Sequence, residues 1–269
     1  MSKIKKIDLL VIDPQEDFCN PKGALSVPGA DKDMERLATL ITRVGARLND
    51  IHMTLDQHHE MDVAHPSFWR GSDGKNPSPF TIITAADVEK GVWTPSITSL
   101  TKRMLDYTRA LEKGSRYPLC IWPAHCLIGS PGAAVMPGVL AALNEWARTE
   151  QAVVHFVSKG SNIFTEHYSG VKAEVPDPED PSTQLNISLI QALEQADEIL
   201  IAGEAGSHCV ANTIRDIADG FSDKDYVKKF TLLTDAVSPV PGFEKLQADF
   251  ISEMTARGMK LSTTSDVMR

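Results

Sequence analysis

The sequence lacks the features that mark a membrane protein or a nucleic-acid-binding protein. No apolar run in its 269 residues is long enough to span a bilayer. Lysine and arginine form no block, and the formal net charge is −9, which argues against nucleic acid and anionic membranes as partners. The basic start at residues 1–6 is followed by a short apolar run without a small-residue cleavage site, so we expect no signal peptide.

Cysteine is also scarce. The chain has four cysteines, and no two of them form a Cys-x-x-Cys pair: Cys19, Cys120, Cys126 and Cys209. In a chain of this length, such scarcity indicates reduced thiols and a cytoplasmic location. Internal repeats and low-complexity tracts are absent as well, and 42% of the residues are hydrophobic, so we expect one domain over residues 1–269.

What is present is an alternation of short apolar runs and helical patterns. Five runs have the length and composition of strands: 7–13, 51–56, 152–159, 198–204 and 229–237. Apolar residues at helical spacing lie between or after them: 32–49, 135–149, 188–197, 209–220 and 242–258. This alternation predicts an α/β fold, a three-layer α/β/α arrangement with a mostly parallel, Rossmann-like central sheet.

Chemically useful side chains follow four of the predicted strands. Asp13, Asp56 and Lys159 end the first three, and the fourth leads through a glycine-rich turn to Cys209 at the start of a helix. Residues at the carboxyl ends of parallel strands meet at one edge of the sheet. A helix N-terminus favours a thiolate, although Cys209 could equally be a small buried hydrophobe. These residue types form a chemical set. An aspartate carboxylate can take the thiol proton, the lysine ammonium can favour the thiolate, and the cysteine can attack a carbonyl to form a thioester.

A second set of residues has the ligand types of a metal site. Asp56 and His58 lie two residues apart, on one side of an extended chain. His65 precedes a proline, and His125 lies in the segment WPAHC (122–126). One aspartate with two or three histidines suits a divalent transition metal: zinc first, with iron or manganese as alternatives. The alternative interpretation is that these histidines are ordinary surface residues.

Five motifs together resemble the isochorismatase-like cysteine hydrolase superfamily, and most closely its nicotinamidase (pyrazinamidase) branch. They are VIDPQEDFC (11–19), LDQH (55–58), WPAHC (122–126), SKG (158–160) and AGEAGSHCV (202–210). The first and last motifs are shared across the superfamily, whereas the second and third resemble the metal site of nicotinamidases. The resemblance implies the isochorismatase-like hydrolase fold. It also implies a metal-containing amidohydrolase that converts a small-molecule amide, nicotinamide or a related aromatic amide, to the acid and ammonia through a cysteine thioester.

The resemblance further implies roles for individual residues. The implied catalytic triad is Asp13, Lys159 and Cys209, and the implied metal ligands are Asp56, His58 and His125, with His65 as a fourth candidate. A non-proline cis peptide between Glu204 and Ala205 would aim backbone N–H groups at the oxyanion. The residues expected to contact the substrate are Phe18 and Trp122, on the two faces of the ring, and His208, where the chain departs from the family pattern. Residues 164–170 are also expected to shape the pocket.

Other functions stay open at this point. A hydrolase with the same thiol chemistry could act on a different amide or ureide. A non-catalytic binding protein could retain the fold, but we would expect it to have lost a triad residue, and none is lost. A thiol mechanism that pairs Cys209 with His208 or His155 is a weaker alternative, because neighbours at a helix start rarely face each other.

Residues 66–121 are too long for a connecting loop and predict a helical insertion. Its apolar positions fall on one face of a predicted helix: Ile97, Leu100, Met104, Tyr107 and Leu111. We expect this face to pack against the sheet domain or against a second subunit of a homo-oligomer. Because the insertion leaves the chain next to His65 and rejoins it next to Trp122, we expect it to cover or border the site.

Overall fold

The computed structural model describes residues 5–114 and 117–269; residues 1–4, part of the basic start, and two residues of the insertion lie outside this description. A six-stranded parallel sheet in the order β10-β9-β8-β1-β2-β7 forms its centre. The strands are β1 (Ile7–Ile12), β2 (Asp50–Asp56), β7 (His155–Lys159), β8 (Glu198–Gly203), β9 (Phe230–Leu233) and β10 (Lys260–Ser262). Among the described residues, none of the helices has the length and apolar character needed to cross a membrane.

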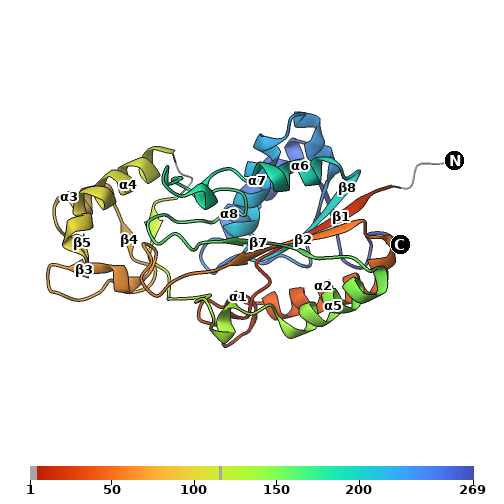
Figure 1. Ribbon diagram of the computed structural model, residues 1–269, viewed down its shortest axis with the longest axis horizontal. Helices are drawn as coiled ribbons and strands as arrows, with labels where there is room; N and C mark the ends of the chain where they lie inside the picture. The colour runs from red at the N-terminus through yellow and green to blue at the C-terminus, as the bar shows by residue number, and fades with distance from the viewer. Residues whose placement is uncertain (1–4, 115–116) are drawn as a thin grey trace.

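Helices cover both faces of this sheet, which confirms the predicted α/β/α arrangement. Figure 1 shows α2 (Ala30–Val44) and α5 (Pro137–Glu150) on one face. The other face carries α6 (Ile187–Glu194), α7 (Cys209–Gly220) and α8 (Glu244–Ala256), and the short helix α1 (Glu16–Cys19) follows β1. Each of the five predicted helical patterns corresponds to one of the five longer helices, α2, α5, α6, α7 and α8.

The predicted strands need correction at β7, β9 and β10. Residues 152–154 lie outside β7, and β7 is not a buried strand, because it forms the edge of the sheet and pairs with β2 alone among the described strands. Phe156 in this strand is accordingly 51% exposed. The predicted strand 229–237 already ends at Leu233, and the sequence analysis missed the short edge strand β10, which has no apolar run of its own.

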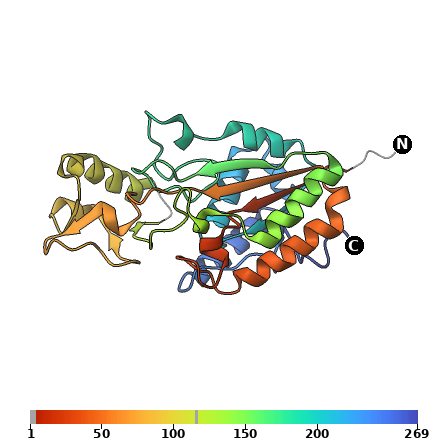
Figure 2. The same ribbon diagram turned by 60° about the horizontal axis from the view of Figure 1, so that its bottom comes forward.

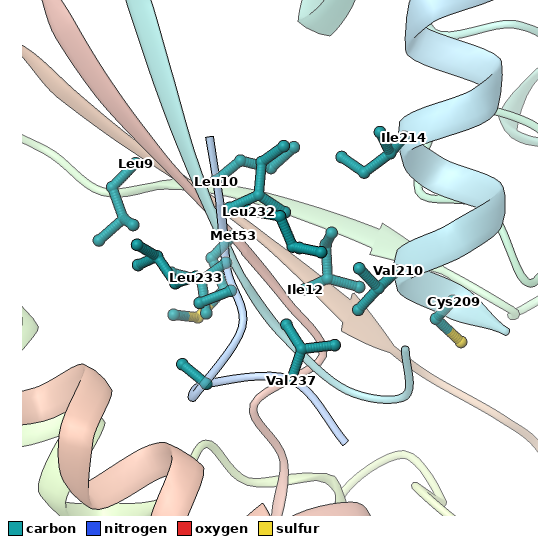
Figure 3. Close-up of a cluster of buried hydrophobic side chains, with 14 of the residues drawn as sticks. Leu9, Leu10, Ile12, Met53, Cys209, Val210, Ile214, Leu232, Leu233 and Val237 are labelled. Carbon is teal, nitrogen blue, oxygen red and sulfur yellow. The ribbon is translucent and has the colours of Figure 1, made fainter. Parts of the chain in front are cut away.

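The main apolar core fixes the position of α7. All six residues of β1 are buried, as expected for a central parallel strand covered on both faces. Figure 3 shows Val210 and Ile214 of α7 directed toward side chains of the sheet such as Ile12. The sulfur of Cys209, one residue earlier, points away from that cluster. Burial of one face of α7 therefore leaves the thiol at the carboxyl edge of the sheet.

The insertion forms a lobe of its own between β2 and β7. It contains α3 (Ala85–Glu89), α4 (Thr101–Gly114) and two small antiparallel sheets: β3 (Trp69–Gly71) with β5 (Trp93–Pro95), and β4 (Ile82–Ile83) with β6 (Leu119–Cys120). Figures 1 and 2 show this lobe at one end of the molecule, beyond the carboxyl ends of the sheet strands. The insertion thus lies on the side of the sheet where the predicted site residues emerge.

The expected packing of the insertion helix was wrong. The apolar face of α4 is buried in a small second core and not against the sheet, because the insertion supplies most of the apolar side chains for such a core. Val63 also belongs to this core, and Phe164 and Val175 of the segment after β7 pack against it. Met104, Tyr107 and Leu111 enter that core together with residues from either side of the helix: Val63, Phe68, Trp69, Ile83, Val88, Leu119 and Ile121. Ile97 is 50% exposed, because the helix begins only at Thr101.

One glycine lets β8 turn closely past β1. Gly203, the last residue of β8, has φ +125°, a conformation that residues with a side chain rarely adopt. A Cβ atom at this position would lie 2.0 Å from the carbonyl oxygen of Ile12. The turn therefore depends on glycine, and it carries the chain from the end of β8 toward Cys209.

We predict that Gly203→Ala lowers the free energy of unfolding by about 2–4 kcal/mol, because it adds a backbone clash to an unfavourable φ angle. Gly138→Ala is the matched control, because Gly138 lies in α5 with no atom within 4 Å of the added carbon. This control should raise the free energy of unfolding by about 0.4–1 kcal/mol. Urea unfolding of both variants measures the difference, and equal stabilities would contradict the role given to Gly203.

Candidate active site

Four adjacent strands bring polar side chains to one edge of the sheet. The order β8-β1-β2-β7 places the turn to Cys209, then Asp13, then Asp56 and Lys159 side by side. Asp56 and Lys159 are direct register partners at the ends of β2 and β7. All four side chains are buried. The strand order therefore explains why residues up to 196 positions apart in the chain, Asp13 and Cys209, share one site.

The ammonium group of Lys159 lies at the centre of this cluster. Its Nζ is 2.9 Å from Asp13 Oδ2 and 3.0 Å from Asp56 Oδ1. It also donates a hydrogen bond of 3.0 Å to the backbone carbonyl of His167, and Cys209 Sγ lies 3.6 Å away. Its hydrogen bonds therefore go to the His167 carbonyl and to the Cys209 sulfur, while the two carboxylates contact it as ion pairs. Lys159 thus acts on the thiol both through its charge and through a hydrogen bond.

Burial and charge set the protonation states of this cluster. Burial raises the pKa of the Cys209 thiol well above its usual range, and Lys159 opposes this shift only in part. Burial also raises the pKa of Asp13, again against the pull of Lys159. Burial alone would lower the pKa of Lys159, but Asp13 and Asp56 raise it well above its usual range. Burial thus favours the thiol form of Cys209 against the preference of the helix N-terminus for a thiolate, and Asp13 is the neighbouring group able to take its proton.

The side chain of Asp13 is held in place by Thr54. The hydroxyl of Thr54 donates a 2.6 Å hydrogen bond to Asp13 Oδ1, which leaves Oδ2 for Lys159. Asp13 itself has φ +44° directly after β1. Thr54 lies on β2 in register with the end of β1, so the sheet pairing that brings the strands together also orients the carboxylate.

A buried group of possible metal ligands adjoins the Lys159 cluster. Asp56 Oδ2 lies 3.0 Å from His58 Nε2 and 3.6 Å from His125 Nε2. The ligand atoms of these three residues lie within 4.8 Å of one another. His125 Nδ1 is 2.8 Å from the backbone carbonyl of Pro123, which can only accept a hydrogen bond, so the lone pair of His125 is on Nε2 and faces Asp56.

This group fits a divalent transition metal. His58 lies between the carboxylates of Asp56 and Asp62; burial alone would lower its pKa, but the two carboxylates raise it well above its usual range. A position that attracts a proton so strongly also attracts a metal cation, which would replace that proton. One carboxylate and two imidazole nitrogens are a donor set that zinc, iron and manganese accept.

Asp13, Asp56 and Cys209 form a second set of close ligand atoms, also within 4.8 Å of one another. Lys159 contacts all three residues, at 2.9, 3.0 and 3.6 Å. Its ammonium group already supplies the positive charge at this position. We therefore assign metal binding to the histidine-containing group and not to this one.

The sequence analysis missed Asp62 as part of the metal group. Asp62 Oδ2 lies 3.1 Å from His58 Nδ1, and this contact leaves His58 Nε2 directed at Asp56. Metal-binding histidines commonly have such a carboxylate partner, so an acidic residue four positions after His58 was a usable signal. His65 lies beside the group but outside the three ligand residues: its Nε2 is 3.4 Å from His125 Nδ1, and burial lowers its pKa to about 4.

Aromatic side chains surround the ring of His208, next to the thiol. The ring centroids of Phe243, Tyr117, Trp122 and Tyr168 lie 4.9–5.3 Å from that of His208. Burial lowers the pKa of His208 to about 4, so this wall of the site carries no positive charge. The wall combines residues from the end of the insertion and just after it, from the segment after Lys159, from the start of α7 and from the start of α8.

The two aromatic residues expected to contact the substrate lie beside different histidines. Trp122 lies by His208 and Phe18 by His125, each pair with ring centroids 5.3 Å apart. The peptide bond between Glu204 and Ala205 is cis, as the resemblance implies. His155 lies at the opposite end of β7 from Lys159 and contacts Asp50, which rules out the proposed pairing with Cys209.

Comparison with known proteins supports the resemblance. No family model matches the chain. It is 26% identical to a nicotinamidase from Escherichia coli over 261 residues, which cover 96% of this chain and 95% of that protein. It shares its fold with the yeast nicotinamidase bound to the inhibitor nicotinaldehyde (TM-score 0.65, 19% identity, 96% and 99% of the two chains). The pyrazinamidase of Pyrococcus horikoshii in complex with zinc is also similar (TM-score 0.55, 20% identity, 96% and 99%).

We predict that Asp62→Asn raises the dissociation constant for zinc about ten- to a hundredfold, because His58 loses the carboxylate that orients it. Asp8→Asn is the matched control. Asp8 is also a buried aspartate near a histidine, His52, but it lies beside the start of β2, away from the metal-ligand candidates at its end. The control should leave zinc affinity unchanged. Competition titration with a chromogenic chelator measures both constants, and equal affinity in the two variants would contradict the orienting role.

Proposed function

We propose that this protein is a metal-containing cysteine amidohydrolase that converts nicotinamide, or a closely related aromatic amide, to the acid and ammonia. The observation that carries the proposal is the direct contact of Lys159 with Asp13, Cys209 and the metal-ligand candidate Asp56. Similarity to a nicotinamidase along 96% of the chain supports the substrate class. The zinc in the pyrazinamidase of the same fold supports zinc as the metal.

In the proposed first half-reaction, Asp13 takes the proton of the Cys209 thiol as the sulfur attacks the amide carbonyl. The raised pKa of Asp13 makes its carboxylate a stronger base than an ordinary aspartate. The same proton then passes to the leaving nitrogen, so that the C–N bond breaks, ammonia departs and a thioester remains on Cys209. The backbone N–H groups of Ala205 and Cys209 are the proposed donors to the oxyanion.

In the proposed second half-reaction, Asp13 acts as base toward water. Water attacks the thioester carbonyl, its proton moves to Asp13, and the C–S bond breaks to release the acid. The proton then returns to the sulfur and restores the thiol. Lys159 stays charged throughout, which stabilises negative charge on the sulfur and keeps Asp13 in place.

The metal and the uncharged wall define the proposed substrate position. Asp56, His58 and His125 would hold the ion, which supplies a Lewis acid able to fix an electron-rich atom of the substrate and to order water. On the other side of the site, the neutral ring of His208 and its aromatic neighbours provide an apolar surface. These surroundings suit an uncharged aromatic ring that carries an amide.

The test is ammonia release from a panel of amides and ureides, with metal analysis of the same chelator-free sample. We expect the highest kcat/KM for nicotinamide and about one divalent ion per chain. A clear preference for a ureide or a non-aromatic amide would favour the related hydrolase considered above. Absence of turnover on every compound would favour a binding protein that retains the fold.

We predict that Cys209→Ala folds normally and loses turnover, because alanine removes only the nucleophilic sulfur. In the wild-type protein, iodoacetamide should modify Cys209 before the other three cysteines, and bound substrate should protect Cys209 from modification. Cys120→Ala is the matched control, since Cys120 is similarly buried and lies in β6, and it should retain turnover. Steady-state ammonia release measures both variants, and turnover by Cys209→Ala would remove this residue from the mechanism.

We also predict that Asp13→Asn and Lys159→Met each lower kcat more than roughly a thousandfold. The double variant should lose little more than either single variant, because the two residues act on one proton transfer as a unit. Steady-state kinetics of the three variants provides the comparison. Losses that multiply in the double variant would show that the two side chains act independently.

A further inference from the structure

The position of Lys159 depends on a segment with little regular structure. Between β7 and α6, residues 160–186 contain one 3-10 turn at Pro181–Thr183 as their only described helix or strand. This segment, which we call the 160–186 loop, supplies the His167 carbonyl that accepts a 3.0 Å hydrogen bond from Lys159 Nζ. A loop that provides a backbone acceptor for a buried ammonium must itself be held in place.

A buried hydroxyl of the insertion holds the loop next to that carbonyl. The hydroxyl oxygen of Tyr107, on α4, accepts a 3.0 Å hydrogen bond from the backbone N–H of Glu166. Glu166 Oε1 in turn accepts a 3.0 Å hydrogen bond from the backbone N–H of His167. Tyr107 and Glu166 are both buried, so no water can easily replace the tyrosine oxygen.

A second contact links α4 to the loop at the surface. Arg103 Nη2 lies 2.7 Å from Asp177 Oδ2, and the guanidinium carbon is 3.8 Å from the centre of the Phe164 ring. Asn162 donates hydrogen bonds to the same Asp177 carboxylate at 3.2 Å and to Asp180 at 2.9 Å. These contacts tie the two branches of the loop together and to the helix.

We propose that α4 is a positioning element for Lys159, acting through Tyr107 and Arg103 on the 160–186 loop. The inference rests on the proposed catalytic role of Lys159. The small core of the insertion fixes the position of α4. The contacts of Tyr107 with Glu166 and of Arg103 with Asp177 then fix the loop that carries the His167 carbonyl. The lobe thereby contributes to the reaction without a residue that touches the reacting atoms.

The buried contact is tested with Tyr107→Phe, which removes only the hydroxyl oxygen. We expect kcat to fall about tenfold or more, since Lys159 is misplaced. KM should change less than twofold, since Tyr168, the residue that the loop adds to the wall around His208, keeps the 3.1 Å hydrogen bond that it accepts from the Trp122 indole. Thr108→Val is the matched control: Thr108 is also buried on α4, but its hydroxyl bonds only carbonyls of its own helix. The control should keep kcat and KM within twofold of the unchanged protein.

The surface contact is tested with Arg103→Ala, which does not depend on the folding of a core variant. We expect kcat to fall about threefold. Arg109→Ala is its control, because Arg109 also forms a 2.7 Å ion pair from α4, but with Glu89 inside the insertion. Equal effects of the two arginine variants, or a Tyr107→Phe variant with kcat within twofold of the unchanged protein, would overturn the proposal.

Hydrogen exchange separates this inference from the proposed function. Peptides covering the 160–186 loop should exchange faster in Tyr107→Phe than in Thr108→Val, and this comparison needs no substrate. Faster exchange with an unchanged kcat would overturn the positioning role. A lack of amide turnover in the unchanged protein would instead refute the proposed function, and unchanged exchange in Tyr107→Phe would show that α4 does not hold the loop.

Discussion

The interaction on which the site depends is the buried contact of one ammonium with two carboxylates. Lys159 lies 2.9 Å from Asp13 and 3.0 Å from Asp56, and all three side chains are almost fully buried. One positive and two negative charges leave an excess negative charge away from water, which is costly unless it is balanced. A proton on His58, or a metal ion in its place, offsets part of this charge and of the charge of Asp62, which faces the other side of the His58 ring. The charge of the thiol site and the charge of the metal group are therefore linked.

The fold makes this contact possible through strand order. Asp13 and Asp56 come from adjacent central strands, Lys159 comes from the edge strand β7, and Cys209 follows β8 through the turn at Gly203. Each residue is placed by sheet pairing or by burial of a helix face, not by a flexible loop. The loop that adjoins them contributes a backbone carbonyl, and the insertion holds that loop from outside.

The sequence was sufficient to predict five of the six strands of the sheet, their parallel arrangement and the residues at the strand ends, because these follow from local apolar periodicity and from sheet geometry. Contacts between distant segments could not be predicted in this way: the Tyr107–Glu166 hydrogen bond joins two parts of the chain with no pattern in common. The balance at Cys209 between burial, which favours the thiol, and the helix N-terminus, which favours a thiolate, could not be predicted either, because the extent of burial is known only from the structure. The placement of Ile97 on the apolar face of the insertion helix was wrong for a simpler reason. The apolar spacing continues before Thr101, where α4 begins.

The central claim is that the Cys209 sulfur attacks a carbonyl carbon held in this site. The most direct measurement is carbon NMR of the protein with an aromatic aldehyde that carries an isotope label at the carbonyl. An aldehyde lacks the leaving nitrogen, so attack by the sulfur should stop at a tetrahedral adduct. The account predicts that the carbonyl signal moves to the tetrahedral region with the unchanged protein and stays in place with Cys209→Ala. An aldehyde that inhibits turnover while its carbonyl signal stays unchanged, or an adduct that persists in Cys209→Ala, would contradict it.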